Sequence, residues 1–353
     1  MSSPADAGVA DAPTVPLAGA AGRAAQIPLA VVTLLAGGLL LGGSYLGTIP
    51  LIAAVAVIQA GLVASWVLGT GLPGRIGAVV LGVLASVGTD VAVVRWSDHG
   101  YQPVLGVLGL AVPLMFVHQL TRGVIRTRVV ESLADITVLL LAVCAIGGLI
   151  LLRYQGNGEK NIDAVVGAMT AALVVAHLTD AVVPVPRFDP QVGRGLPAVV
   201  LGLVAGAAVG ELVLREIIDY QGARAAFLGA AVGGVSCLLS VGASFAWVHS
   251  TLTPSRPLVG AADETAALTP VTSNSASGVT SNSASDGVSG TAGDGPSTGA
   301  DVDDDIDDDA DEVGRIDVRA WTGIPRLRPV AAALITVALT APAGYVLINA
   351  LSS

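Results

Sequence analysis

Long apolar stretches recur along most of this chain and are separated by short polar segments. Nine of them hold about 20 mostly uncharged residues, the length that an α-helix needs to cross the ~30 Å hydrocarbon core of a bilayer. They lie at residues 27–46, 50–70, 75–95, 103–120, 130–152, 162–184, 196–215, 224–248 and 329–350. The pattern predicts an all-α, polytopic integral membrane protein with nine transmembrane helices.

Turn residues separate the first three stretches. Gly-Thr-Ile-Pro occupies 47–50 and Gly-Leu-Pro-Gly occupies 71–74. Glycine and proline favour tight turns, so we expect the first three spans to be antiparallel neighbours.

Two segments have a different composition. Residues 251–325 repeat Val-Thr-Ser-Asn-Ser-Ala-Ser at 271–277 and 279–285, and nine of the twelve residues from 301 to 312 are acidic. Such segments bury too little apolar surface to offset their ordering entropy. We therefore expect a disordered tail at 1–26, helices within 27–250, a disordered loop at 251–325 and a last span within 326–353.

Composition supports the membrane assignment. The chain is 53% hydrophobic and only 12% charged, about half the charge of a typical soluble domain. Its 44 glycines suit close helix packing in lipid. These features argue against a soluble enzyme or a nucleic-acid-binding protein, and membrane lipids, anionic ones included, are the expected partners.

The distribution of basic residues predicts an orientation. If the N-terminus is inside, 12 of the 17 Lys and Arg residues lie on the inner side and 5 on the outer side. Cytoplasmic loops carry the excess of positive charge. We therefore expect a multi-pass protein of the plasma (cytoplasmic) membrane, with the N-terminus inside and the C-terminus outside.

Ionisable residues inside spans are costly and therefore mark candidate sites. They include Asp90, Asp135 and Glu211. His177 and Asp180 are three residues apart and hence share a helix face, where a carboxylate could orient an imidazole or join it on a cation. The alternative is an interfacial or interhelical hydrogen-bonding role.

Arg122, Arg126 and Arg128 form a short basic cluster after the fourth stretch. Anionic lipid headgroups attract such clusters, although the same residues can act only as a topology signal. Signatures of the common metalloproteases, NTPases and hydrolases are absent from the sequence.

Three blocks in the second half of the chain share their order and spacing with a known enzyme family. They are the apolar helix 173–180 ending in Asp180 with the glycine-rich stretch 194–210, the stretch 227–242, and the segment from Arg328 to Thr-Ala-Pro-Ala-Gly-Tyr at 340–345. They resemble the phosphatidate cytidylyltransferase (CDP-diacylglycerol synthase) family, whose blocks contain Asp-Thr-Gly-Ala-Tyr, Gly-Asp and Ala-Pro-x-x-Tyr. The likeness covers roughly residues 160–350.

This resemblance implies a lipid-related role with altered chemistry. The family's activity would need Mg²⁺ held by carboxylates, and Asp180 is the matching candidate ligand, with His177 beside it. Arg194 and Arg328 become candidates for binding lipid headgroups. Most motif residues are missing, however: Ala181-Val182-Val183 follows Asp180, and Gly242-Ala243 stands in place of Gly-Asp.

Three functions remain open at this point. We expect a scaffold without the family's activity that binds lipid or a membrane partner. One alternative is an active CTP-dependent phosphatidate cytidylyltransferase using Mg²⁺. The other is a small-solute or ion transporter that uses the intramembrane Asp, Glu and His residues.

Overall fold

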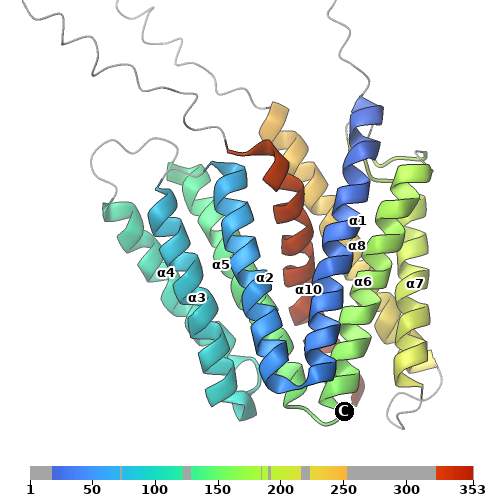
Figure 1. Cartoon of the computed structure of the whole chain (residues 1–353), viewed down its shortest axis with the longest axis horizontal. Helices are drawn as coiled ribbons and strands as arrows, with labels where there is room; N and C mark the ends of the chain where they lie inside the picture. Colours follow the sequence, from blue (N-terminus) through green and yellow to red (C-terminus); the bar gives the residue numbers. More distant parts are fainter. Residues whose placement is uncertain are drawn as a thin grey trace, which may run out of the picture. The chain divides into compact units, whose positions relative to one another are not determined.

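Helices account for most of the residues that the computed structural model describes, which are 18–71, 74–121, 129–183, 185–189, 192–215, 223–252 and 323–352. The long ones are α1 (Ala18–Leu46), α2 (Thr48–Thr70), α3 (Arg75–Arg95), α4 (Gln102–Thr121), α5 (Val129–Arg153), α6 (Gly158–Val182), α7 (Leu196–Leu214), α8 (Ala223–Leu252) and α10 (Arg328–Ser352). Within the described ranges these nine helices are long and apolar enough to cross a membrane, and no strand is present (Figure 1). The predicted all-α, multi-pass fold is confirmed.

Helix boundaries lie close to those expected from the sequence, except at the start of α1. This helix begins at Ala18, inside the tail expected at 1–26, and its first residues are mainly alanines. Alanine has the highest helix propensity of all residues, which explains the early start. Residues 1–17 and 253–322, which include nearly all of the expected acidic loop, lie outside the described residues.

Glycines end or separate the first helices. Gly47, between α1 and α2, has φ 122°, and Gly71, after α2, has φ 67°. Both values lie in the region that favours glycine. The helices α1, α2 and α3 pack in sequence as antiparallel neighbours, as predicted (Figure 1).

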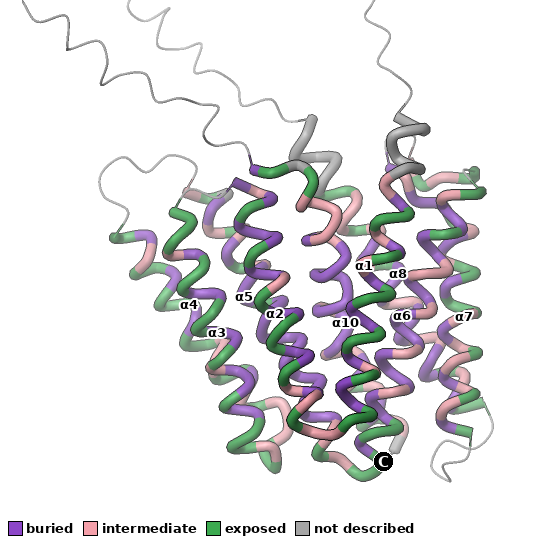
Figure 2. The backbone as a smooth tube through the Cα atoms, in the orientation of Figure 1, coloured by how far each residue is buried: buried purple, intermediate pink, exposed green. Residues whose placement is uncertain are grey.

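Burial differs strongly among the helices. The helices α5, α6 and α10 are mostly buried, α4 exposes most of its residues, and the residues of α7 are mainly half-buried or exposed (Figure 2). Exposed apolar side chains are numerous and include Leu35, Val87, Leu110 and Phe116. An outer surface of this composition is typical of helices that face lipid.

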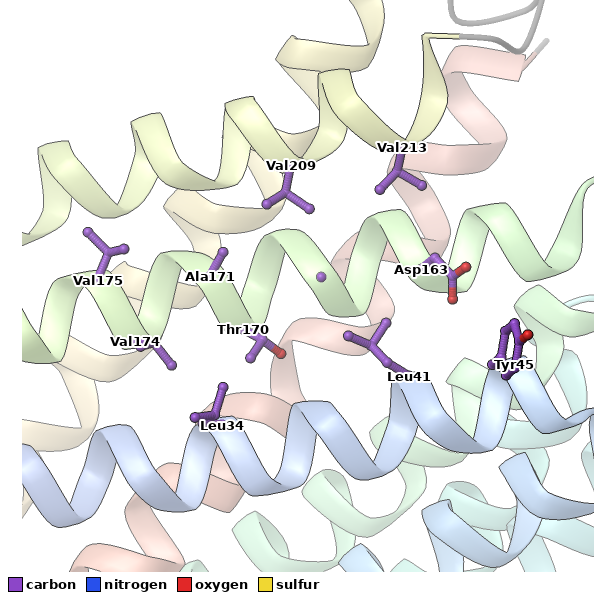
Figure 3. Close-up of a pocket in the computed structure, with 11 residues that line it drawn as sticks. Leu34, Leu41, Tyr45, Asp163, Thr170, Ala171, Val174, Val175, Val209 and Val213 are labelled. Atoms are coloured by element: carbon purple, nitrogen blue, oxygen red, sulfur yellow. The ribbon is translucent and has the colours of Figure 1, made fainter.

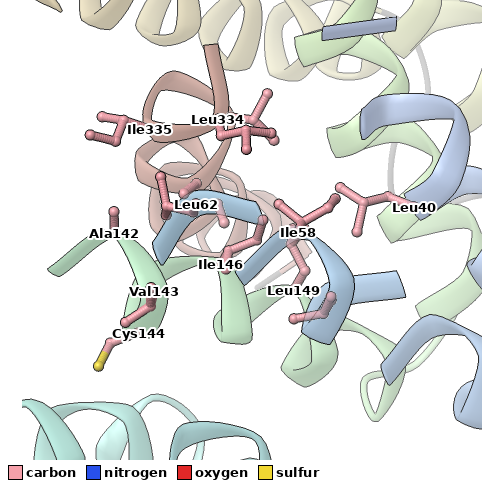
Figure 4. Close-up of a cluster of buried hydrophobic side chains, with 14 of the residues drawn as sticks. Leu40, Ile58, Leu62, Ala142, Val143, Cys144, Ile146, Leu149, Leu334 and Ile335 are labelled. Atoms are coloured by element: carbon pink, nitrogen blue, oxygen red, sulfur yellow. The ribbon is translucent and has the colours of Figure 1, made fainter. Parts of the chain in front are cut away.

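Large aliphatic side chains fill the interior between α1, α2, α5 and α10. Leu40, Ile58, Leu62, Ile146 and Leu149 are all buried there (Figure 4). Since lipid tails are as apolar as these residues, dispersion contacts rather than water exclusion hold such helices together in a bilayer.

Glycines also bring α7 and α8 together. A Cβ atom on Gly206 or Gly210 of α7 would meet backbone atoms of Gly229 in α8, and one on Gly229 would meet the backbone of both. The two backbones therefore approach each other as closely as small residues permit.

Candidate functional site

A buried polar cluster joins four segments at the end of the bundle where α1 begins. It consists of Gln26 in α1, His177 and Asp180 in α6, Arg194 just before α7, and Ser240 and Ser244 in α8. The sequence placed His177 and Asp180 on one helix face, and the structure adds Arg194 at the same point.

The segment between α6 and α7 directs Arg194 into the bundle. The Phe188 N–H donates to the Arg194 carbonyl oxygen (3.2 Å), and the Leu196 N–H donates to the Pro186 carbonyl oxygen (3.2 Å). The Gly195 N–H donates to Oδ1 of Asp180 (2.9 Å). These bonds fold the segment back onto the end of α6, so that the Arg194 side chain enters the interior.

The guanidinium of Arg194 bonds to several groups of the cluster. Its Nη1 donates to Oδ2 of Asp180 (3.1 Å) and its Nε to Oγ of Ser244 (3.4 Å). Its Nη2 lies against Oγ of Ser240 and 3.4 Å from Nε2 of His177. The guanidinium therefore points toward protein groups rather than toward a lipid headgroup.

His177 links this ion pair to α1. Its Nδ1 lies 2.9 Å from Oε1 of Gln26, and an amide oxygen can only accept, so Nδ1 carries the proton and Nε2 accepts from Arg194. The Nε2 of Gln26 in turn donates to the Gly193 carbonyl oxygen (3.3 Å). The imidazole is thus a neutral bridge between helices.

The ion pair is almost fully buried. The Arg194 and Asp180 side chains are 4% and 2% exposed. Burial lowers the pKa of the Arg194 guanidinium from its ordinary value, and the Asp180 carboxylate opposes that shift. Because each charge is desolvated, each depends on the other for compensation.

This arrangement does not fit a Mg²⁺ site. Magnesium needs octahedral oxygen ligands, usually with more than one carboxylate or phosphate. Both oxygens of Asp180 already accept hydrogen bonds, and the adjacent charge is a cation. Among the described residues no three His, Cys, Asp or Glu side chains gather where they could hold a metal ion.

The other intramembrane carboxyl groups lie on different helices. Asp90 of α3 contacts Gln59 of α2, whose Nε2 lies 3.0 Å from Oδ1 of Asp90. Asp135 is half-buried near the start of α5, and its backbone oxygen accepts a hydrogen bond from Nε1 of Trp66 (3.1 Å). Glu211 is half-buried near the end of α7.

Of the remaining basic candidates, the structure describes only Arg328. Arg122, Arg126 and Arg128 lie outside the described residues. Arg328 begins α10, and its Nε donates to the Gly69 carbonyl oxygen at the end of α2 (3.2 Å). Arg328 therefore connects two helices, a role that its position in the sequence did not indicate.

A groove of about 600 Å³ runs along α6 between α1 and α7 (Figure 3). Its floor includes Asp163, Gly167, Ala171 and Val175 of α6. Residues four apart lie on one helix face. Gly167 lets α7 approach closely, since a Cβ atom there would lie 3.0 Å from Cγ1 of Val209, and Ala171 adds only a methyl group to the floor.

Apolar side chains form the two walls of this groove. Leu34 and Leu41 extend from α1, and Val209 and Val213 extend from α7 (Figure 3). The carboxylate of Asp163 and the ring of Tyr45 lie near each other at one end, and the Thr170 hydroxyl is a further polar group midway along the groove. Neither Asp163 nor Tyr45 was a candidate from the sequence, and the small residues Gly167 and Ala171, four and eight positions after Asp163, were the signal that could have indicated the groove.

Comparison with known protein families, with curated proteins and with solved structures gives no match for this chain. The resemblance to phosphatidate cytidylyltransferases therefore stays a prediction that depends on three short blocks of sequence.

Proposed function

We propose that this protein binds a membrane phospholipid in the groove along α6 and has no catalytic activity. The observation that carries the proposal is a groove with apolar walls and a single carboxylate at one end, Asp163. An amphiphile with a polar headgroup and an acyl chain has the same distribution of polarity.

The length of the groove suits a lipid of one leaflet. Twelve residues separate Asp163 from Val175, which corresponds to about 18 Å along a helix. Half of the hydrocarbon core of a bilayer measures about 15 Å. Asp163 lies near the start of α6, so a headgroup beside it would be at the membrane interface and the chain would extend toward the midplane.

The charge at the polar end favours a headgroup that carries an amine. Asp163 is half-buried, and no Lys, Arg or His of the described residues forms a salt bridge with it. Lys160 and Arg153 act on Asp163 electrostatically, but Arg153 forms its salt bridge with Glu159 (3.5 Å). An ammonium group would compensate the carboxylate, and the Tyr45 ring could add a cation–π contact.

The predicted orientation would place this headgroup in the outer leaflet. Asp163 lies at the end of the bundle opposite the start of α1 (Figure 1). With the N-terminus inside, that end faces outward. A lipid with an anionic headgroup would instead be repelled by Asp163.

Native mass spectrometry of the protein from nanodiscs tests the proposal. With equal amounts of phosphatidylethanolamine and phosphatidylglycerol of the same acyl chains, we expect one retained lipid, enriched in the ethanolamine form. Ala171→Phe fills the floor of the groove and should abolish retention. Ala56→Phe makes the same change on the exposed face of α2 and should leave retention intact; equal loss in both variants, or in neither, refutes the groove.

A second variant separates headgroup recognition from chain binding. Asp163→Asn should keep the bound lipid but lose the preference for the amine. Asp98→Asn removes an exposed acid near the same end of the bundle and should leave the preference unchanged. A preference that survives Asp163→Asn would show that Asp163 does not select the headgroup.

The catalytic alternative has less support, because Asp180, the metal ligand that the resemblance implies, bonds to Arg194 and Gly195. We expect the purified protein with CTP, phosphatidate and Mg²⁺ to form no CDP-diacylglycerol. Product formation that Asp180→Ala abolishes would overturn the non-catalytic part of the proposal.

A further inference from the structure

A carboxyl group and an amide meet in the interior between α2, α3 and α5. Asp90 is 9% exposed and Gln59 is 1% exposed. The Nε2 of Gln59 donates to Oδ1 of Asp90 (3.0 Å) and to the Val143 carbonyl oxygen (3.1 Å). Both amide hydrogens are therefore used.

Within the described part of the chain, Asp90 has no basic side chain as an ion-pair partner. The nearby polar groups are neutral: Thr89 Oγ1 donates to Cys144 Sγ (3.3 Å), and the Tyr101 hydroxyl donates to the Ala145 carbonyl oxygen (3.4 Å). An isolated buried carboxylate is so costly that such a group is expected to become neutral.

The side-chain carbonyl oxygen of Gln59, Oε1, is buried and accepts no hydrogen bond from the residues that the structure describes. A buried acceptor left unsatisfied is itself destabilising. A donor on the Asp90 carboxyl group would satisfy it.

We propose that Asp90 is a proton-binding site, in which the carboxylic acid O–H donates to Oε1 of Gln59 while Nε2 of Gln59 donates to Oδ1. Acid and amide then form a closed ring of two hydrogen bonds. One proton removes the uncompensated charge and also satisfies the orphaned oxygen. The ligand of this site is a proton, and the site is independent of the lipid groove.

The same change from Asp to Asn, made at residue 90 and at residue 180, distinguishes this site from the polar cluster. In Asp90→Asn the new amide N–H can replace the acid O–H, so we expect the melting temperature in detergent to change by no more than about 2 °C. Asp180→Asn removes a charge that Arg194 needs and should lower the melting temperature by about 6 °C or more. Equal destabilisation by the two variants overturns the proposal.

Infrared difference spectroscopy tests the proton directly. The wild-type protein at neutral pH should show the carbonyl band of a protonated carboxylic acid, and Asp90→Asn should lack it. The same band should persist in Asp163→Asn. If no such band is lost in Asp90→Asn, the proposal fails.

A monovalent cation could supply the missing positive charge instead. Titration with NaCl, at constant ionic strength set by choline chloride, separates the two ligands. We expect no sodium-dependent rise in the melting temperature. A rise that disappears in Asp90→Asn would replace the proton with a metal ion and overturn the proposal.

Discussion

The ion pair between Asp180 and Arg194 gives the sharpest prediction about stability. Asp180→Asn leaves the guanidinium buried among neutral groups, and Arg194→Gln leaves the carboxylate without a cation. Because both side chains are almost fully buried, removing either partner should lower the free energy of unfolding by about 3–5 kcal/mol. Exposed pairs, by contrast, contribute only about 0–1 kcal/mol.

The double variant Asp180→Asn/Arg194→Gln determines how much of this loss comes from the unpaired charge. With both charges absent, only neutral polar groups remain, so we expect a smaller loss than the sum of the single variants. The coupling energy should be about 2–3 kcal/mol. Unfolding in mixed micelles with increasing SDS, followed by tryptophan fluorescence, measures all three free energies.

The pair between Arg153 and Glu159 is the matched control. It is a single contact of 3.5 Å with side chains 20% and 49% exposed, so Glu159→Gln should cost at most about 1 kcal/mol. If Asp180→Asn costs no more than Glu159→Gln, the charges in the polar cluster are solvated, and the argument from burial is wrong.

Two further predictions concern packing. Gly206→Ala should destabilise the protein, because its Cβ atom would meet the backbone of α8. Gly242 faces open space, so Gly242→Ala should be neutral or stabilise the protein by up to about 1 kcal/mol. Thermal unfolding in detergent compares the two variants, and equal effects would contradict close packing of α7 and α8. Cys144 and Cys237 are buried free thiols, so a maleimide should label them only after unfolding, and rapid labelling of the folded protein would show that these interiors open.

Much of the fold was predictable because a span imposes a simple requirement. About 20 apolar residues must satisfy all backbone hydrogen bonds within one helix, and this leaves a direct trace in the sequence. The first helix shows where that reasoning ends: Ala18 begins α1, but residues 18–26 carry helix propensity rather than hydrophobicity. A pattern of apolar residues cannot locate a helix that extends beyond the membrane.

The sites were less predictable, because their partners are distant in the sequence. His177 and Asp180 were expected to share a face, but Gln26 lies 151 positions away from His177. Arg194 was a candidate for binding a lipid headgroup, since nothing in the sequence showed that the segment between α6 and α7 folds back onto α6. The groove depends on the small residues Gly167 and Ala171 between two neighbouring helices, and their effect is visible only when the neighbours are known.

Three carboxyl groups in this bundle show three ways of placing an acid in an apolar surrounding. Asp180 keeps a partner of opposite charge, Arg194. Asp90 accepts a hydrogen bond from a neutral amide, that of Gln59, and we propose that a proton neutralises it. Asp163 lies half-buried at the end of a groove, where we propose that the amine of a lipid compensates it.

These three surroundings predict different responses to the same change from Asp to Asn. We expect a large loss of stability at 180, little change at 90, and a loss of lipid preference without loss of stability at 163. Measuring the three variants together therefore tests whether the surroundings of each acid, rather than its presence inside a span, determine what it does.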